Sequence, residues 1–261
     1  MSSADPDPSL ELARRTWPEA RERFGPELFC ILPIGSTEPH GPHLPLDVDV
    51  TIAEAQARRA AERLVELGAD ALVLPAMPYG VTFFTDGFEG RVTVRPGTLW
   101  AVLEDLVESL SEQGVRRILL CNGHLEPAHI KVLRGIALDY GEEREGKARV
   151  AFPDNTRRRW AGTLGEEFKS GDCHAGRYES SIVLAADPDS VREDERAALP
   201  PVAVDLVAKM QAGARSFREV GAVDAYCGAP SEATAAEGVE LIDALATMVV
   251  ETARETWPEA F

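Results

Sequence analysis

The chain has 261 residues, of which 44 % are hydrophobic, and this is enough to bury a large core in one α/β domain or in two smaller ones. It carries 44 acidic and 27 basic side chains, so its formal net charge is −17. Such a charge repels phosphate backbones and anionic lipids. Nucleic acid and membranes are therefore excluded as expected partners.

The cysteines and the start of the chain indicate a reduced, cytoplasmic protein. The four cysteines show no CxxC spacing, so neither a disulfide framework nor a thiolate metal site is expected. The first residues lack a basic start followed by an apolar segment, and no apolar run reaches about eighteen residues. We expect residues 1–27 to form a leader and a helix, and residues 28–261 to form a single domain.

Hydrophobic periodicity predicts the elements in chain order. A helix over 9–24 precedes a short buried strand in FCILPIG, residues 29–35. A second helix is expected from Thr51, whose spacing to Glu54 is that of a capping box, to a stop at Gly68. Beyond it the pattern predicts strands at 71–76, 116–121 and 148–153, and helices at 98–113, 127–140, 176–186 and 235–254.

Strand and helix alternate along the chain, which predicts an α/β fold with a mostly parallel sheet and helices on both faces. In such sheets the ligand binds beyond the carboxyl ends of the strands. Two long loops, 77–97 and 154–172, are expected to border that site and to determine substrate choice.

Residues suited to metal binding follow two of the predicted strands. Glu38 and His40 come after the first strand, and His124 and Glu126 come after the strand at 116–121. Both pairs have i, i+2 spacing, which points two side chains to the same side of an extended chain. Asp49, at the start of the next helix, is expected to reach the same cleft.

Three carboxylates and two imidazoles suit a pair of divalent ions such as Zn, Mn or Fe. A third cluster, SGDCHAGRYESS, places His174 in a loop before a helix and Glu179 in the first turn of that helix. A histidine near the metals but not bound to them can shuttle a proton. We therefore take His174 and Glu179 as the candidate catalytic residues.

Four stretches of the chain carry a family resemblance. They are GSTEPHGPHLPLDVD, CNGHLEP, HAGRYESS and GAPSEATAAEGVELI, spread from about residue 30 to residue 245. By these motifs the chain resembles the creatininase (creatinine amidohydrolase) family. The resemblance covers most of the chain.

The resemblance implies a three-layer α/β/α fold, two divalent metal ions per chain with zinc favoured over manganese or iron, and a homo-oligomer, with hexamers known in the family. By motif position it implies that Glu38 and His124 bind one metal, that His40 and Glu126 bind the second, and that Asp49 bridges them. It implies hydrolysis of a C–N bond in a small, cyclic amide by a hydroxide that the metals activate, with His174 as acid and base.

Several alternatives stay open. The same site would suit a formamide deformylase or a peptidase, or the chain could be a metal-binding scaffold without turnover. Asp47 is a rival to Asp49, and Asp49 could act as a helix-start acid only. Glu126 and Glu179 could each stabilise the start of a helix. An arginine lining the cleft would favour an anionic substrate, the candidates being Arg91, Arg95 and Arg177.

Overall fold

A computed structural model describes residues 8–261 of the chain. Its centre is a sheet of four strands, β1 (Phe29–Ile34), β2 (Ala71–Val73), β3 (Arg117–Asn122) and β4 (Arg149–Ala151). The strand order is β2-β1-β3-β4 and every pairing is parallel, with Phe29 opposite both Ala71 and Arg117. The predicted parallel sheet is therefore confirmed.

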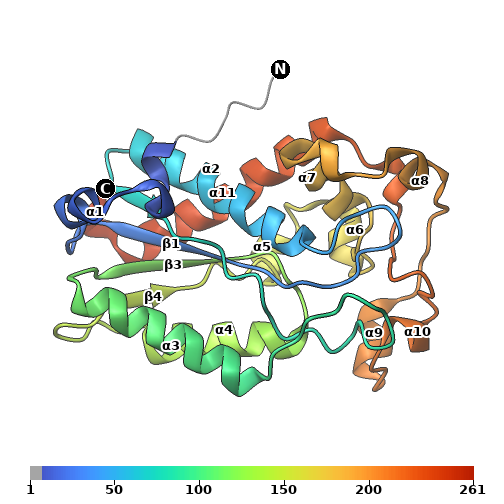
Figure 1. Ribbon diagram of the computed structural model, residues 1–261. Helices are drawn as coiled ribbons and strands as arrows, with labels where there is room; N and C mark the ends of the chain where they lie inside the picture. Colours follow the sequence, from blue (N-terminus) through green and yellow to red (C-terminus); the bar gives the residue numbers. More distant parts are fainter. Residues whose placement is uncertain (1–7) are drawn as a thin grey trace.

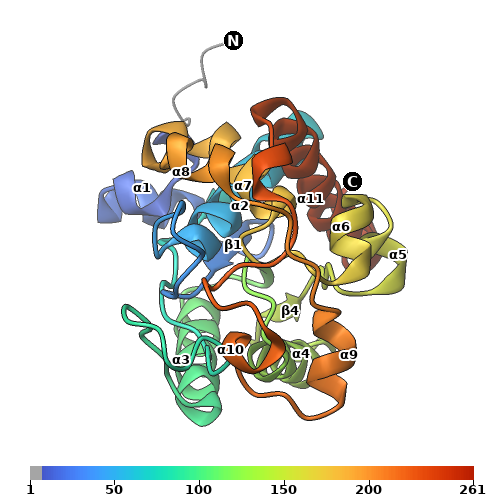
Figure 2. The same cartoon turned by 90° about the vertical axis from the view of Figure 1, so that its right-hand side faces the viewer.

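Helices cover both faces of this sheet, so the fold has three layers, with the sheet in the middle (Figure 1). The long helices are α2 (Val48–Glu66), α3 (Pro96–Glu112), α4 (Pro127–Asp139), α7 (Arg177–Ala186) and α11 (Ala235–Thr256). Seen end-on, the sheet lies between α2 and α11 on one side and α3 and α4 on the other (Figure 2). The predicted α/β/α architecture is confirmed.

Alternate residues of β1 separate the two halves of the core. Cys30 and Leu32 belong to the cluster that includes the apolar faces of α3 and α4, whereas Phe29 and Ile31 pack with α2 and α11. Successive side chains of a strand point to opposite faces, so a strand covered on both sides must be apolar throughout. This is why FCILPI has no polar side chain and why the sheet is buried.

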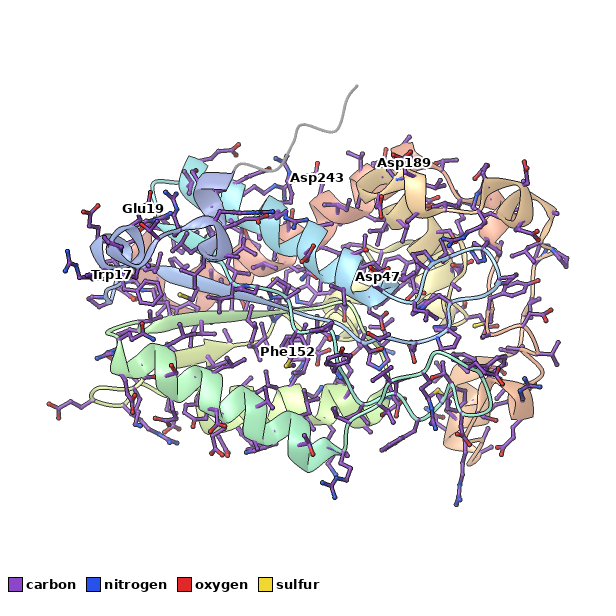
Figure 3. All side chains as sticks on the ribbon, viewed as in Figure 1. Trp17, Glu19, Asp47, Phe152, Asp189 and Asp243 are labelled. Carbon is purple, nitrogen blue, oxygen red and sulfur yellow. The ribbon has the colours of Figure 1, made fainter. Side chains whose placement is uncertain are left out.

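Helix α2 begins earlier than the sequence predicts. The expected start at Thr51 with a Glu54 capping box is wrong, because the helix begins at Val48 and the N–H of Thr51 already donates to the carbonyl of Asp47 at 2.9 Å. Asp47 occupies the N-cap position and lies at that end of the helix in Figure 3. The earlier start places Asp49 inside the first helical turn rather than before it.

Short helices occur at the start of the chain and in the region 154–234. The helix expected over 9–24 consists of two 3-10 turns, Pro8–Leu10 and Leu12–Arg14, and α1 (Trp17–Arg23), which has a capping box between Thr16 and Glu19. The region 154–234 contains short helices that the sequence reading did not predict, namely α5 (Arg158–Ala161), α6 (Gly165–Ser170), α8 (Glu193–Ala198), α9 (Leu206–Gln211) and α10 (Phe217–Val220). Within residues 8–261, no helix combines the length and apolarity needed to cross a bilayer.

Candidate active site

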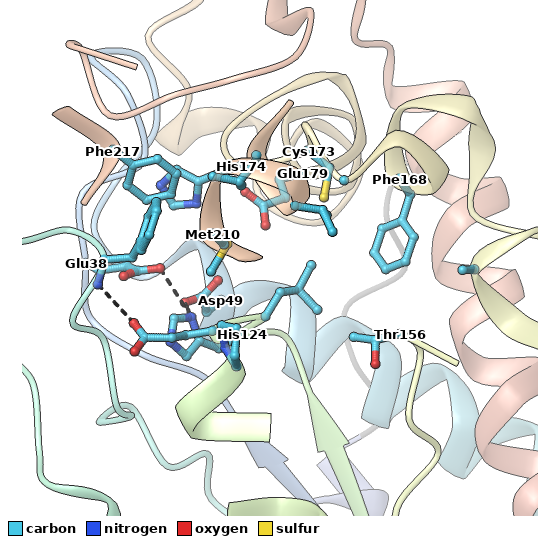
Figure 4. Close-up of a pocket in the computed structure, with 18 of the residues that line it drawn as sticks. Glu38, Asp49, His124, Thr156, Phe168, Cys173, His174, Glu179, Met210 and Phe217 are labelled. Atoms are coloured by element: carbon cyan, nitrogen blue, oxygen red, sulfur yellow. Dashed lines mark hydrogen bonds and ion pairs between the residues drawn. The ribbon is translucent and has the colours of Figure 1, made fainter. Parts of the chain in front are cut away.

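The predicted metal-binding side chains gather at the carboxyl ends of β1 and β3. Glu38 and His40 lie in the loop after β1, and His124 lies in the loop after β3. Asp49 reaches them from the first turn of α2, and Glu179 from the first turn of α7. All five residues are buried, and none has more than 4 % of its surface exposed. Figure 4 shows Glu38, Asp49, His124 and Glu179 around one cavity.

Two glycines allow Asp49 to approach the strand ends. A Cβ on Gly35 would lie 2.5 Å from the backbone nitrogen of Val50, and one on Gly123 would lie 2.1 Å from the carbonyl oxygen of Asp49. Real side chains do not tolerate such contacts, so both positions require glycine. The loops after β1 and β3 thus fit directly against the first turn of α2.

The ligand-type atoms form three overlapping groups, each within 4.8 Å. Glu38, Asp49 and His124 make one group, and His40, Asp49 and Glu179 make another. Asp49 belongs to both, with Oδ2 2.9 Å from Nδ1 of His124 and Oδ1 3.3 Å from Nε2 of His40. The third group joins Glu38, His40 and His174. A carboxylate that offers one oxygen to each side has the geometry of a bridging ligand.

Glu126 differs from this pattern. Its carboxylate accepts hydrogen bonds from the N–H groups of Phe83 and Phe84, at 2.5 and 3.1 Å. It belongs to none of the three groups, and Glu179 stands beside His40 instead. The family motif implied that Glu126 pairs with His40, but its side chain, at the N-cap position of α4, points to the 77–97 loop.

Backbone carbonyls fix which imidazole nitrogen faces each group. Nε2–H of His124 donates to the carbonyl of Val81 at 2.8 Å, so its Nδ1 faces Glu38 and Asp49. His40 has the opposite arrangement, because its Nδ1–H donates to the carbonyl of Glu38 at 3.0 Å and its Nε2 faces Asp49 and Glu179. Such hydrogen bonds orient histidines that bind metals.

Hydroxyl groups that no sequence motif predicts orient the carboxylates. Ser36 donates to Oδ2 of Asp49 at 2.7 Å. Thr82 and Thr85, from the 77–97 loop, both donate to Oε2 of Glu38. Serine and threonine near a metal motif carry no distinctive spacing, so only the fold could reveal these contacts.

The buried carboxylates of the site stabilise positive charge on the groups around them. Burial alone would lower the pKa of His40, but Asp49 and Glu179 raise it to about 10. Burial likewise opposes ionisation of His124, yet Glu38 and Asp49 hold its pKa well above the usual range. Burial raises the pKa of Glu179 to about 8. A divalent ion would take the place of the protons that these groups hold.

One buried atom is left without a hydrogen-bond partner at the point where a metal would bind. Nε2 of His40 is fully buried and makes no hydrogen bond, although Asp49 Oδ1 and Glu179 Oε2 lie within 3.5 Å. Buried nitrogens are almost always hydrogen-bonded or bound to a metal. The nitrogen and oxygen donors suit Zn or Mn, so the residues fit a resident divalent ion.

His174 is held beside the two groups. Its ring stacks on Phe217, with centroids 4.1 Å apart, and lies 4.4 Å from the ring of His40. Nε2–H donates to the carbonyl of Pro39 at 3.0 Å, which leaves Nδ1 as its free nitrogen. Burial and the neighbouring His40 lower the pKa of His174 to about 3, so the imidazole is neutral at neutral pH.

A cavity of about 420 Å³ opens beside the metal-type groups. Its volume falls within the range of sites for drug-sized ligands. In Figure 4, Phe168 and Thr156 lie on the opposite side from Glu38 and Phe217. Most of the remaining lining is apolar and comes from Phe84, Leu125, Ala161, Phe168, Leu206, Val207, Met210 and Phe217.

The other histidines have structural contacts. His43 bonds through Nε2 to the hydroxyl of Ser180 at 2.9 Å. His129 donates from Nε2 to the side chain of Asn122 and accepts from the N–H of Val81. The thiol of Cys173 lines the cavity, but burial raises its pKa well above the usual range, so it is not a thiolate.

Comparisons with known proteins agree with the motifs. The sequence model of the creatininase family, described as creatinine amidohydrolase, matches residues 13–253. The chain is 33 % identical over 214 residues to the mycofactocin precursor peptide peptidase of Mycolicibacterium smegmatis, covering 80 % of this chain and 78 % of the relative. It is 29 % identical over 218 residues to a creatinine amidohydrolase of Pseudomonas putida, covering 74 % and 78 %.

The fold is also found among solved structures. A solved structure described as "Creatininase Mn" matches with a TM-score of 0.71 and 24 % identity, covering 95 % of this chain and 99 % of that one. Because the family model spans nearly the whole chain, the resemblance predicted from the four motifs is confirmed: the chain belongs to the creatininase family.

Proposed function

We propose that this protein is a two-metal hydrolase that cleaves the amide bond of a short peptide or a peptide-like amide. The observation that carries the proposal is Asp49, which is shared between the Glu38–His124 group and the His40–Glu179 group beside an apolar cavity. Two metal sites that share a carboxylate are typical of hydrolases. The family's amidohydrolase and peptidase members fit this chemistry.

In this proposal Glu38 and His124 hold one ion, His40 and Glu179 hold the other, and Asp49 bridges them. Glu179 thus takes the ligand position that motif spacing assigned to Glu126. Divalent ions, when bound here, would activate water and polarise the amide carbonyl. Of zinc, manganese and iron, zinc is favoured, because two imidazoles and three carboxylates suit it, and manganese is the second choice.

His174 is proposed to move the proton. Its Nε2–H is engaged with Pro39, so the unprotonated Nδ1 is the atom that can take a proton from the attacking water and pass it to the departing nitrogen. Stacking on Phe217 keeps the ring in one orientation beside the cavity. Glu126 is proposed to hold the 77–97 loop in place through the N–H groups of Phe83 and Phe84, and thereby to shape the entrance.

The cavity favours a substrate larger than a small cyclic amide. A volume of about 420 Å³ with an apolar lining fits a substrate that carries an apolar side chain next to the scissile bond. The peptidase relative from Mycolicibacterium smegmatis supports the same choice. The second candidate is hydrolysis of a small cyclic amide, which the creatinine amidohydrolase relative favours.

Metal analysis and a substrate panel test the proposal. Protein purified without added metal, and after reloading with Zn or Mn, should contain about two ions per chain by plasma mass spectrometry. The loaded protein should hydrolyse short peptides with apolar residues faster than creatinine, hydantoins or formamides. Absence of metal after reloading would refute the metal centre. Turnover of creatinine alone would select the second candidate.

A further inference from the structure

The cavity holds a basic side chain that the proposed chemistry does not use. Lys169, on α6, is the single lysine or arginine among the residues of the described chain that line it. The adjacent Phe168 lies across the cavity from Glu38 and Phe217 in Figure 4. Lys169 thus belongs to the lining of the same cavity as the candidate metal ligands Glu38 and Asp49.

The ammonium group of Lys169 is available to a ligand. Nζ lies 2.7 Å from Oε1 of Glu166, three residues earlier, but the side chain of Glu166 is 89 % exposed and that of Lys169 is 45 % exposed. An exposed pair of this kind contributes little, because water and salt screen it and both long side chains lose freedom. A carboxylate held in the cavity would be a better partner.

Two of the three arginines that the sequence suggested for this role are paired elsewhere. Arg91 pairs with Asp86 at 2.8 Å, and Arg177 pairs with Glu232 and Glu237. In the described part of the chain, neither they nor Arg95 line the cavity. The basic group that the cavity presents to a substrate thus comes from α6.

The charges of the cavity are separated. Glu38, Asp49 and Glu179 make the metal side acidic, and the chain as a whole carries −17. An anionic group on a substrate is repelled by this field unless a cation receives it. Lys169 supplies that cation, and apolar side chains such as Leu125 and Met210 make up the lining around it.

We propose that Lys169 binds a free carboxylate of the substrate while the scissile amide lies at the metal side. The substrate class is then a short peptide, or an acylated amino acid, whose C-terminal carboxylate lies on the leaving side of the amide. This inference rests on the proposed amide hydrolysis and narrows it to cleavage near a free C-terminus.

The test compares each peptide as a free acid and as its C-terminal amide, with Zn- or Mn-loaded protein. The wild-type protein should prefer the acid by about tenfold or more in kcat/KM, because a charge-assisted contact is lost in the amide. Lys169→Met should bring the ratio near one by raising KM for the acid, whereas Lys169→Arg should keep part of the preference. Lys131→Met, an exposed lysine on α4, is the matched control and should leave the ratio unchanged.

Binding supplies a second readout that does not need turnover. Calorimetry with N-acetylphenylalanine and its carboxamide should show tighter binding of the acid to the metal-loaded wild-type protein and equal binding to Lys169→Met. Equal affinity for both in the wild-type protein would overturn the carboxylate site. Hydrolysis of acid and amide with equal efficiency would overturn it too, while leaving the amide-hydrolase proposal intact. Acid-selective binding without hydrolysis of any peptide would support Lys169 and count against the proposed reaction.

Discussion

The metal side and the opposite wall of the cavity are built in different ways. The metal side comes from loops after β1 and β3 and from the first turns of α2 and α7, and its ligand-type side chains are almost fully buried and fixed by hydrogen bonds. The opposite wall comes largely from the short helices α6 and α9, and Lys169 there is half exposed. The rigid side suits chemistry, and the more open side suits substrate choice.

The first prediction concerns the shared carboxylate of the metal side, Asp49. Asp49→Asn should lose metal from both groups and reduce turnover to background, because one side chain serves both. Asp47→Asn is the matched control, since Asp47 is exposed at the N-cap of the same helix and makes no side-chain cap bond. Plasma mass spectrometry and kcat measure the two outcomes. A metal-replete, active Asp49→Asn protein would rule out the proposed bridge.

The second prediction tests two glutamates, of which the sequence assigned Glu126 to a metal and Glu179 to catalysis. Glu179→Gln should lose one of about two ions, because Glu179 lies beside His40 and Asp49. Glu126→Gln should keep both ions and lower kcat/KM by about tenfold through a displaced 77–97 loop. The metal content of the two variants shows which glutamate binds an ion. Loss of an ion from Glu126→Gln alone would restore the pairing expected from the motif.

The third prediction changes the opposite wall. Met210→Ser should reduce kcat/KM for a peptide with an apolar side chain by about tenfold, as expected for a lost apolar contact, and leave metal content unchanged. Leu138→Ser, on the outer face of α4 and 78 % exposed, is the control. Equal kinetics of Met210→Ser and the wild-type protein would show that α9 does not contact the substrate.

The smallest effect is expected at Asp154, two residues before Thr156, which lines the cavity. Burial would raise the pKa of the Asp154 carboxyl, but the hydrogen bonds from Arg134 and Thr156 and the charge of Arg134 together lower it. A lowered folded-state pKa stabilises the fold above the unfolded value of about 4, and the gain disappears as pH falls through the folded value. Asp154→Asn should therefore cost about 1–3 kcal/mol of unfolding free energy at pH 7. Urea unfolding at several pH values checks this: a deficit that does not shrink in acid would contradict it.

Some of this site was predictable from spacing. Glu38, His40 and His124 follow strands whose apolar runs are readable, and parallel strands bring their carboxyl ends to one edge. Spacing alone leaves the role of Glu126 open, because Glu126 lines the same cavity as His124 but its carboxylate accepts hydrogen bonds from the N–H groups of Phe83 and Phe84. Spacing also could not show that Glu179 lies beside His40, because its position depends on how α7 packs against α2 and α11.

The sequence by itself determined the family, the alternation of strands and helices, and the residue types that a divalent metal requires, because these depend on local periodicity and on motif composition. Only the tertiary structure decided that Glu179 joins His40, that Glu126 bonds the 77–97 loop, and that Lys169 lines the same cavity as the ligand-type side chains. These are distances between segments far apart in the chain, and they follow from packing of helices on the sheet rather than from any local pattern.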